Sequence, residues 1–107
     1  MNYNIDLQNI ADQLDFDLED VEMLMGLFLD TAKESLSKME QGIVNHNFED
    51  IFISAHSIKG SALNLTLTDI SQIAQNIEIE ARAKNKIDYL EQYKLLDTMI
   101  SDIKILN

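Results

Sequence analysis

The fifteen residues IFISAHSIKGSALNL, which run from Ile51 to Leu65, decide the fold of this chain. Their apolar members recur every three or four residues, at Ile51, Ala55, Ile58, Ala62 and Leu65, and this is the spacing of one face of an α-helix. The chain has no proline and only three glycines, so few residues interrupt helices. The stretch therefore predicts a helix that packs by one face.

The same spacing continues on both sides of this stretch. Three further apolar stripes have it: Val21, Leu24, Phe28, Ala32, Ser35, Met39 and Ile43; Ile70, Ile73, Ile77 and Ala81; and Tyr89, Tyr93, Leu96, Ile100 and Ile103. Because the connections between the stripes are short, consecutive helices must run antiparallel. We therefore expect an all-α fold, an antiparallel up-down four-helix bundle with a short extra N-terminal helix over Ile5–Leu14. The bundle forms a single domain over residues 1–107.

Helix starts are marked by side chains that can accept hydrogen bonds from free backbone N–H groups. Four pairs have this pattern: Asp17 with Asp20, Asn47 with Asp50, Thr66 with Asp69, and Asp88 with Glu91. Phe16 and Val21 occupy the two positions of a hydrophobic staple around the first pair. We expect each pair to begin one of the four long helices.

Composition excludes several classes of protein. Nineteen acidic and eight basic residues give a formal net charge of −11, which disfavours nucleic acid and anionic membranes as partners. There is no cysteine for a disulfide or a zinc site. The longest apolar run, Met23–Leu29, is too short to span a bilayer, and Met1–Ile10 lacks the basic residues of a signal peptide. We expect a cytoplasmic protein, either free-standing or part of a longer chain.

The motifs of common enzymes and metal sites are missing. Three isolated glycines cannot form a phosphate-binding loop for ATP or NAD. A di-iron bundle needs Glu three residues before His, but Ile43 and Ile53 precede His46 and His56 at that distance. The acidic residues 12–22 lack the spacing and the glycine of a calcium loop. We expect no metal, no cofactor and no conventional catalysis, and we interpret His46 as a polar loop residue.

His56 lies on a second face of the helix over residues 51–65. Phe52, His56, Lys59, Gly60 and Leu63 cluster roughly 130° from the core stripe at 100° per residue. A glycine inside a helix costs ~1 kcal/mol relative to alanine, so Gly60 needs a reason. One turn after His56, it leaves bare backbone where a partner would approach the imidazole. Phe52 and Leu63 flank the histidine with apolar surface that suits protein docking.

The charge around His56 suits a small anion. Between Ile51 and Thr68 there is no carboxylate, and His56 and Lys59 are the only ionisable side chains. An imidazole in water is mostly neutral near pH 7, so one ring nitrogen keeps a lone pair that can act as a nucleophile. A phosphoryl group there adds about two negative charges, which Lys59 could stabilise. A structural histidine beside an unrelated Lys-Gly pair is the simpler alternative, and the combination of features favours phosphoryl transfer.

The stretch Ala55-His56-Ser57-Ile58-Lys59-Gly60-Ser61, followed by Asn64-Leu65, resembles the signature of histidine-containing phosphotransfer (HPt) domains. Ile77-Glu78 and Ala81-Arg82 resemble the helix that follows it, and the resemblance covers the chain from about Asp17 onward. It implies a four-helix bundle whose exposed histidine takes a phosphoryl group from one response-regulator receiver domain and passes it to another. By this resemblance His56 is phosphorylated, Lys59 is its charge partner and Gly60 keeps access open. Thr66 and Ala74 replace a frequent glycine and cysteine, which concerns the turn and the packing.

The resemblance also implies how the partner is bound. The residues that we expect to contact it are Phe52, Ser57, Ser61, Leu63, Asn64 and Arg82. Arg82 is either a rim contact or a solvated charge, because it lies about 9 Å from the level of His56 along an antiparallel helix. That level is nearer Gln75, Asn76 and Ile79. Magnesium is expected on the receiver, since we expect no carboxylate of this chain near the site. The domain is then not an autonomous kinase, and a hybrid sensor histidine kinase is a further partner.

Two other functions stay open. One is a helical adaptor that binds signalling partners through the face around Phe52 and Leu63 without chemistry. The other is a metal-binding bundle enzyme, which predicts metal in the purified protein. Met23, Met25 and Leu27 either extend the docking surface or pack under the small first helix, and we favour the second.

Overall fold

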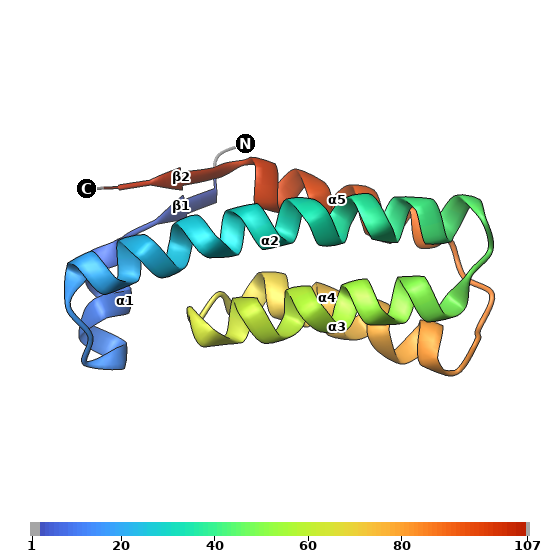
Figure 1. Ribbon diagram of the computed structural model, residues 1–107, viewed down its shortest axis with the longest axis horizontal. Coiled ribbons are helices and arrows are strands. Elements are labelled where there is room, and N and C mark those ends of the chain that lie inside the picture. Colours follow the sequence, from blue (N-terminus) through green and yellow to red (C-terminus); the bar gives the residue numbers. More distant parts are fainter. Residues whose placement is uncertain (1–2, 107) are drawn as a thin grey trace.

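The structure, a computed structural model, describes residues 3–106 and is a helical bundle, as expected (Figure 1). Its elements in chain order are β1 (Tyr3–Ile5), α1 (Leu7–Leu14), α2 (Leu18–Val44), α3 (Phe48–Asn64), α4 (Thr68–Arg82), α5 (Tyr89–Ser101) and β2 (Ile103–Ile105). In Figure 1, α2, α3, α4 and α5 run in alternating directions, and α1 lies at the end where α2 begins. Helix α3 packs against α2 and α4, and α5 packs against the same two helices. Within the described residues, no helix is long and apolar enough to cross a membrane.

Two short strands replace the expected helix at both chain ends. β1 and β2 pair in parallel, with Tyr3 opposite Ile103 and Ile5 opposite Ile105. The predictions that Ile5 begins the first helix and that Ile103 continues the last one are therefore wrong. Asp6 explains the first boundary, because its side chain accepts the backbone N–H groups of the first turn of α1. The last helix ends before Ile103 because residues 103–105 pair with β1 and so cannot form another turn of helix.

The buried stripe of α3 is the predicted one, whereas that of α2 is broader. Ile51, Ala55, Ile58, Ala62 and Leu65 are all buried. Helix α2 buries Val21, Met25, Phe28, Ala32, Leu36 and Met39, while the predicted Leu24, Ser35 and Ile43 lie half-buried at the edge. The broader face arises because α2 packs on both α3 and α5.

Two apolar side chains of α2 are mostly exposed to solvent. Met23 is 67% exposed and Leu27 is 59% exposed, whereas Met25 is buried. The expectation that Met23 and Leu27 pack under the first helix is therefore wrong. They lie on the outer side of α2, because the inward positions of this part of the helix are taken by Val21, Met25 and Phe28.

Two of the four predicted helix starts are capped as expected. The backbone N–H of Asp50 donates to Asn47 Oδ1 over 3.1 Å at the start of α3. The backbone N–H of Glu91 donates to Asp88 Oδ1 over 3.0 Å at the start of α5. These caps depend on residues three apart in sequence, so the sequence alone locates them.

The other two starts differ from the prediction. Asp17 precedes α2, but its side chain makes no capping hydrogen bond, and Phe16 is 47% exposed, which does not fit a hydrophobic staple. Thr66 does not cap α4. It has a left-handed φ of 58°, and the N–H of Leu67 donates to the carbonyl of Ala62, which closes the end of α3. The tight turn between two packed helices imposes this conformation on Thr66.

Candidate functional site

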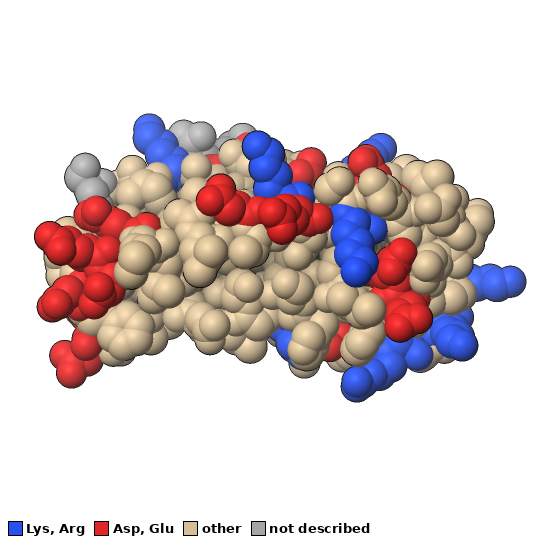
Figure 2. Space-filling model, in the orientation of Figure 1, with Lys and Arg blue, Asp and Glu red and all other residues tan. Residues whose placement is uncertain are grey.

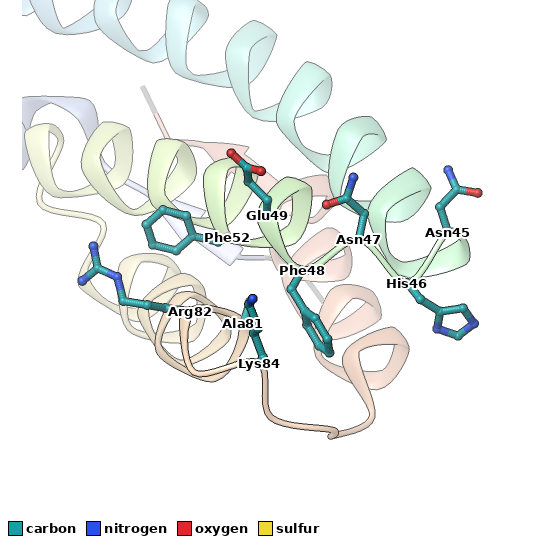
Figure 3. Close-up of a pocket in the computed structure, with 9 residues that line it drawn as sticks. All are labelled: Asn45, His46, Asn47, Phe48, Glu49, Phe52, Ala81, Arg82 and Lys84. Atoms are coloured by element: carbon teal, nitrogen blue, oxygen red, sulfur yellow. The ribbon is translucent and has the colours of Figure 1, made fainter.

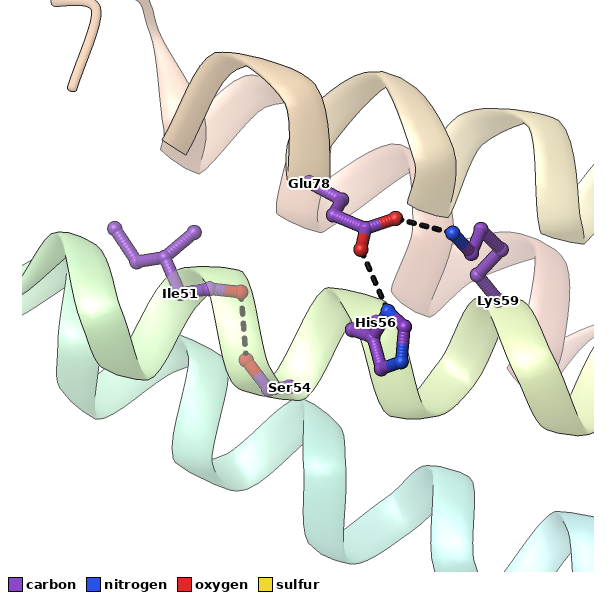
Figure 4. A network of polar contacts seen from close by, with 5 residues as sticks. All are labelled: Ile51, Ser54, His56, Lys59 and Glu78. Atoms are coloured by element: carbon purple, nitrogen blue, oxygen red, sulfur yellow. Dashed lines mark hydrogen bonds and ion pairs between the residues drawn. The ribbon is translucent and has the colours of Figure 1, made fainter. Parts of the chain in front are cut away.

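His56 lies in the middle of α3 and faces solvent. Its neighbours Ala55 and Ile58 are buried in the core, and the 100° turn per residue directs His56 outward. Its side chain is 62% exposed. The ring is held in place nonetheless, because Nδ1 lies 2.6 Å from Oε2 of Glu78 on α4 (Figure 4).

Glu78 joins His56 to Lys59. Lys59 Nζ lies 2.6 Å from Glu78 Oε1, so each oxygen of this buried carboxylate has one partner. The expectation that no carboxylate of this chain lies near the site is therefore wrong. Lys59, which we expect to stabilise the phosphoryl group, is paired with Glu78 and only 23% exposed along its side chain. The correction comes from the neighbouring helix, which the acid-free window in sequence does not include.

A sequence signal for Glu78 was present. Ala74, Ile77, Glu78 and Ala81 are spaced as the inward face of one helix, and Ala74, Ile77 and Ala81 are buried. An acid in such a row needs a partner. The residues expected near the level of His56 are Gln75, Asn76 and Ile79; Glu78, which lies next to Ile79 and meets His56, is not among them.

The pKa of Glu78 determines which nitrogen of His56 is free. Burial raises the pKa of this carboxyl, but hydrogen bonds from Lys59 and His56 and their positive charge outweigh burial and hold the pKa below its ordinary value of 4.5. An ionised carboxylate only accepts hydrogen bonds, so Nδ1 of His56 must carry the proton. The lone pair is then on Nε2. Figure 4 shows this second nitrogen pointing away from Glu78.

Phe52 and Arg82 extend the site along the bundle. The Phe52 ring stacks on His56, with centroids 6.0 Å apart and an angle of 28° between the planes. Arg82 reaches from α4 to Phe52, with Cζ 4.9 Å from the ring centroid. Arg82 therefore contacts the residue one helical turn before His56, which agrees with its offset along the helix axis.

Three other predicted contact residues lie along the seam between α3 and α2. Ser35 Oγ donates to Ser57 Oγ over 3.4 Å, and Ser61 Oγ donates to the carbonyl of Ser57 over 3.0 Å. Ser61 and Asn64 line a shallow groove of about 110 Å³ together with Leu27 of α2. The exposed faces of the two helices are therefore continuous at this groove.

An uncharged patch covers this part of the surface, formed by the exposed or half-exposed residues Met23, Gly26, Leu27, Gly60, Leu63 and Asn64. Leu63 is 52% exposed. A Cβ added at Gly60 or Gly26 would meet nothing within 4 Å. Packing within the chain therefore does not require glycine at either position, although each weakens its helix.

Among the described residues, no three His, Asp or Glu side chains come together as a metal site would need. Glu78, the carboxylate at the site, uses both of its oxygens for Lys59 and His56.

Comparison with known protein families identifies the chain. The family model of the Hpt domain matches residues 23–105, which include α3 with His56 and α4 with Glu78. Comparisons with curated proteins and with solved structures returned no match. Hpt domains are phosphotransfer carriers of two-component signalling, are generally not kinases, and generally interact with response-regulator receiver domains. The match covers most of the chain, and the protein therefore belongs to the Hpt domain family.

Proposed function

We propose that this protein is a phosphorelay carrier. Nε2 of His56 accepts a phosphoryl group from the aspartyl phosphate of one receiver domain and passes it to the aspartate of another. The observation that carries this proposal is the contact between His56 Nδ1 and Glu78, because it leaves the lone pair on the solvent-facing nitrogen.

The transfer step balances with the groups at hand. The Nε2 lone pair attacks phosphorus, the N–P bond forms, and the bond from phosphorus to the receiver's aspartate oxygen breaks. The carboxylate leaves with the electron pair. The ring then has a proton on Nδ1 and a phosphoryl group on Nε2, so it gains positive charge. Glu78, 2.6 Å from Nδ1, stabilises that charge. The second receiver reverses these bond changes.

Lys59 acts mainly through Glu78. Its ion pair over 2.6 Å keeps the buried carboxylate ionised, and so keeps the proton on Nδ1 of His56. Lying one turn after His56 on α3, Lys59 also adds positive charge beside the incoming phosphoryl group. Because both Glu78 oxygens are bonded, we place the magnesium ion of the reaction on the receiver.

The uncharged patch serves as the docking surface for the receiver. Bare backbone at Gly60 lets a partner approach the edge of the His56 ring, and Leu63 offers exposed apolar area next to it. Ser57, Ser61, Leu63 and Asn64 are the contact residues on this side of His56, and Phe52 is the contact residue on its other side. The helical adaptor remains the alternative, because such a patch binds a partner equally well without any chemistry.

A labelled receiver separates the two functions. The protein is mixed with a receiver that carries ³²P on its aspartate. The carrier gains a label that acid removes and alkali does not, and His56→Gln gains none although circular dichroism shows it folded. The matched control is His46→Gln, which changes the other histidine, in the exposed turn after α2, and keeps the label. A labelled His56→Gln protein would refute the proposal, and an unlabelled wild type that binds the receiver would establish the adaptor.

A further inference from the structure

A second surface lies on the other side of His56 from the uncharged patch. A groove of about 640 Å³ runs between the start of α3 and the end of α4 (Figure 3). Phe48 and Phe52, both half-buried, and the buried Ala81 line it, together with the cationic side chains Arg82 and Lys84. The groove therefore combines apolar surface with positive charge.

The cations belong to an unusually basic segment of an acidic protein. Arg82, Lys84 and Lys86 are three of the eight basic residues of the chain, and no acid occurs between Glu80 and Asp88. All three are exposed, and none forms an ion pair with a carboxylate of the described residues. Figure 2 shows acidic side chains gathered at the opposite end of the molecule, formed by α1 and the start of α2.

The one acid that lines the groove does not neutralise these cations. In Figure 3 the Glu49 carboxylate points away from both Arg82 and Lys84. Arg82 lies over the Phe52 ring and makes no hydrogen bond to another side chain in residues 3–106. Its guanidinium N–H groups can therefore bind a carboxylate while its flat face stays on the ring.

We propose that this groove binds an acidic peptide segment of a partner protein. Carboxylates of the segment pair with Arg82 and Lys84, and one apolar side chain lies against Phe48 and Phe52. Charge complementarity selects this occupant, because the groove is a cationic site on a protein of net charge −11. A nucleic acid fits less well, because its binding needs a larger basic surface than this short segment provides.

Phe52 connects the groove to the histidine. Its ring lines the groove and also stacks on His56. An apolar side chain that enters the groove therefore meets the same ring that positions the imidazole. We expect the His56 signals to shift when the groove is filled. Peptide binding needs no phosphoryl group, so it succeeds or fails independently of the relay function.

The test is an NMR titration of the ¹⁵N-labelled protein with the peptide acetyl-Asp-Asp-Phe-Asp-Asp-amide. We expect shifts at residues 46–52 and 81–86. Arg82→Gln combined with Lys84→Gln should weaken binding about tenfold, as expected for the loss of two charge contacts. Lys94→Gln combined with Lys104→Gln removes the same charge from exposed positions on α5 and β2, and should bind as the wild type does. Thermal unfolding shows that both double variants fold.

Three outcomes would overturn the proposal. The first is equal binding of the control peptide acetyl-Lys-Lys-Phe-Lys-Lys-amide, which would leave charge without a role. The second is equal weakening by the two double variants, which would mean that only net charge matters. The third is tighter binding of a ten-residue oligothymidylate at the same residues, which would identify the groove as a nucleic-acid site.

Discussion

Replacing Glu78 by Gln should move the proton of His56 from one ring nitrogen to the other. Glutamine keeps the size of the side chain and one acceptor oxygen, but it loses the charge and gains an NH₂ donor. Lys59 can only donate, so the glutamine oxygen must face Lys59. The NH₂ group then faces Nδ1 of His56, which has to become the acceptor. The proton moves to Nε2, and the exposed lone pair is lost.

The magnitude follows from the two bonds that Glu78 accepts. A hydrogen bond to a charged group contributes about 1.5–3 kcal/mol to stability. The bond from Lys59 lies in the upper part of that range because its side chain is 23% exposed, and the bond from His56 in the lower part because its side chain is 62% exposed. Because Gln keeps neutral versions of both bonds, we expect a loss of about 2 kcal/mol, or about 10 °C in Tm. Phosphoryl uptake should fall roughly 100-fold, as when a group that stabilises the charge developing in the transition state is removed.

Proton-coupled ¹⁵N NMR of the imidazole reports which ring nitrogen carries the proton, and ³²P uptake from a labelled receiver reports the rate. The matched control is Glu80→Gln, which removes the same charge from the same helix. Glu80 is half-buried, and its Oε2 accepts from Asn85 Nδ2 over 2.9 Å, away from His56. An unchanged His56 tautomer in Glu78→Gln, with uptake equal to that of Glu80→Gln, would refute the reasoning.

Three further predictions concern acidity and backbone geometry. The difference in unfolding free energy between wild type and Glu78→Gln should shrink as pH falls below 4.5. The folded state lowers the pKa of Glu78, so the stability that this carboxylate contributes is present above pH 4.5 and is lost as pH falls through the lowered pKa. Urea titrations at several pH values measure the difference, and a difference that stays constant down to pH 2 contradicts the prediction. Gly60→Ala should raise stability by about 1 kcal/mol and slow phosphoryl uptake. Gly42→Ala should instead lower stability, because the added Cβ would lie 3.0 Å from Asp50 Cβ. Thermal melts in which both variants change Tm in the same direction would argue against this. Thr66→Gly should raise stability by about 1 kcal/mol by relieving the left-handed backbone, and a lower Tm would show that the turn is not strained.

Local spacing was sufficient to predict much of the architecture. The α3 stripe and the caps at Asn47 and Asp88 were predicted because each depends on residues three or four positions apart. The outward direction of His56 follows in the same way, from its place between the buried Ala55 and Ile58. The buried face of helix α2 was predicted less well, because the spacing of its apolar residues does not show how many other helices it packs against.

Contacts between distant residues were decided only by the tertiary structure. Glu78 meets His56 because α4 packs on α3 with one axial register and one rotation, and a small change in either would place another side chain at that level. The pairing of β1 with β2 joins the two ends of the chain, and neither strand forms without the other. The left-handed Thr66 likewise arises from the tight turn between α3 and α4. The sequence alone therefore determined that an exposed histidine lies on the outer face of a helix. Helix packing determined which of its ring nitrogens is free, because the proton is held on Nδ1 by a carboxylate from another helix.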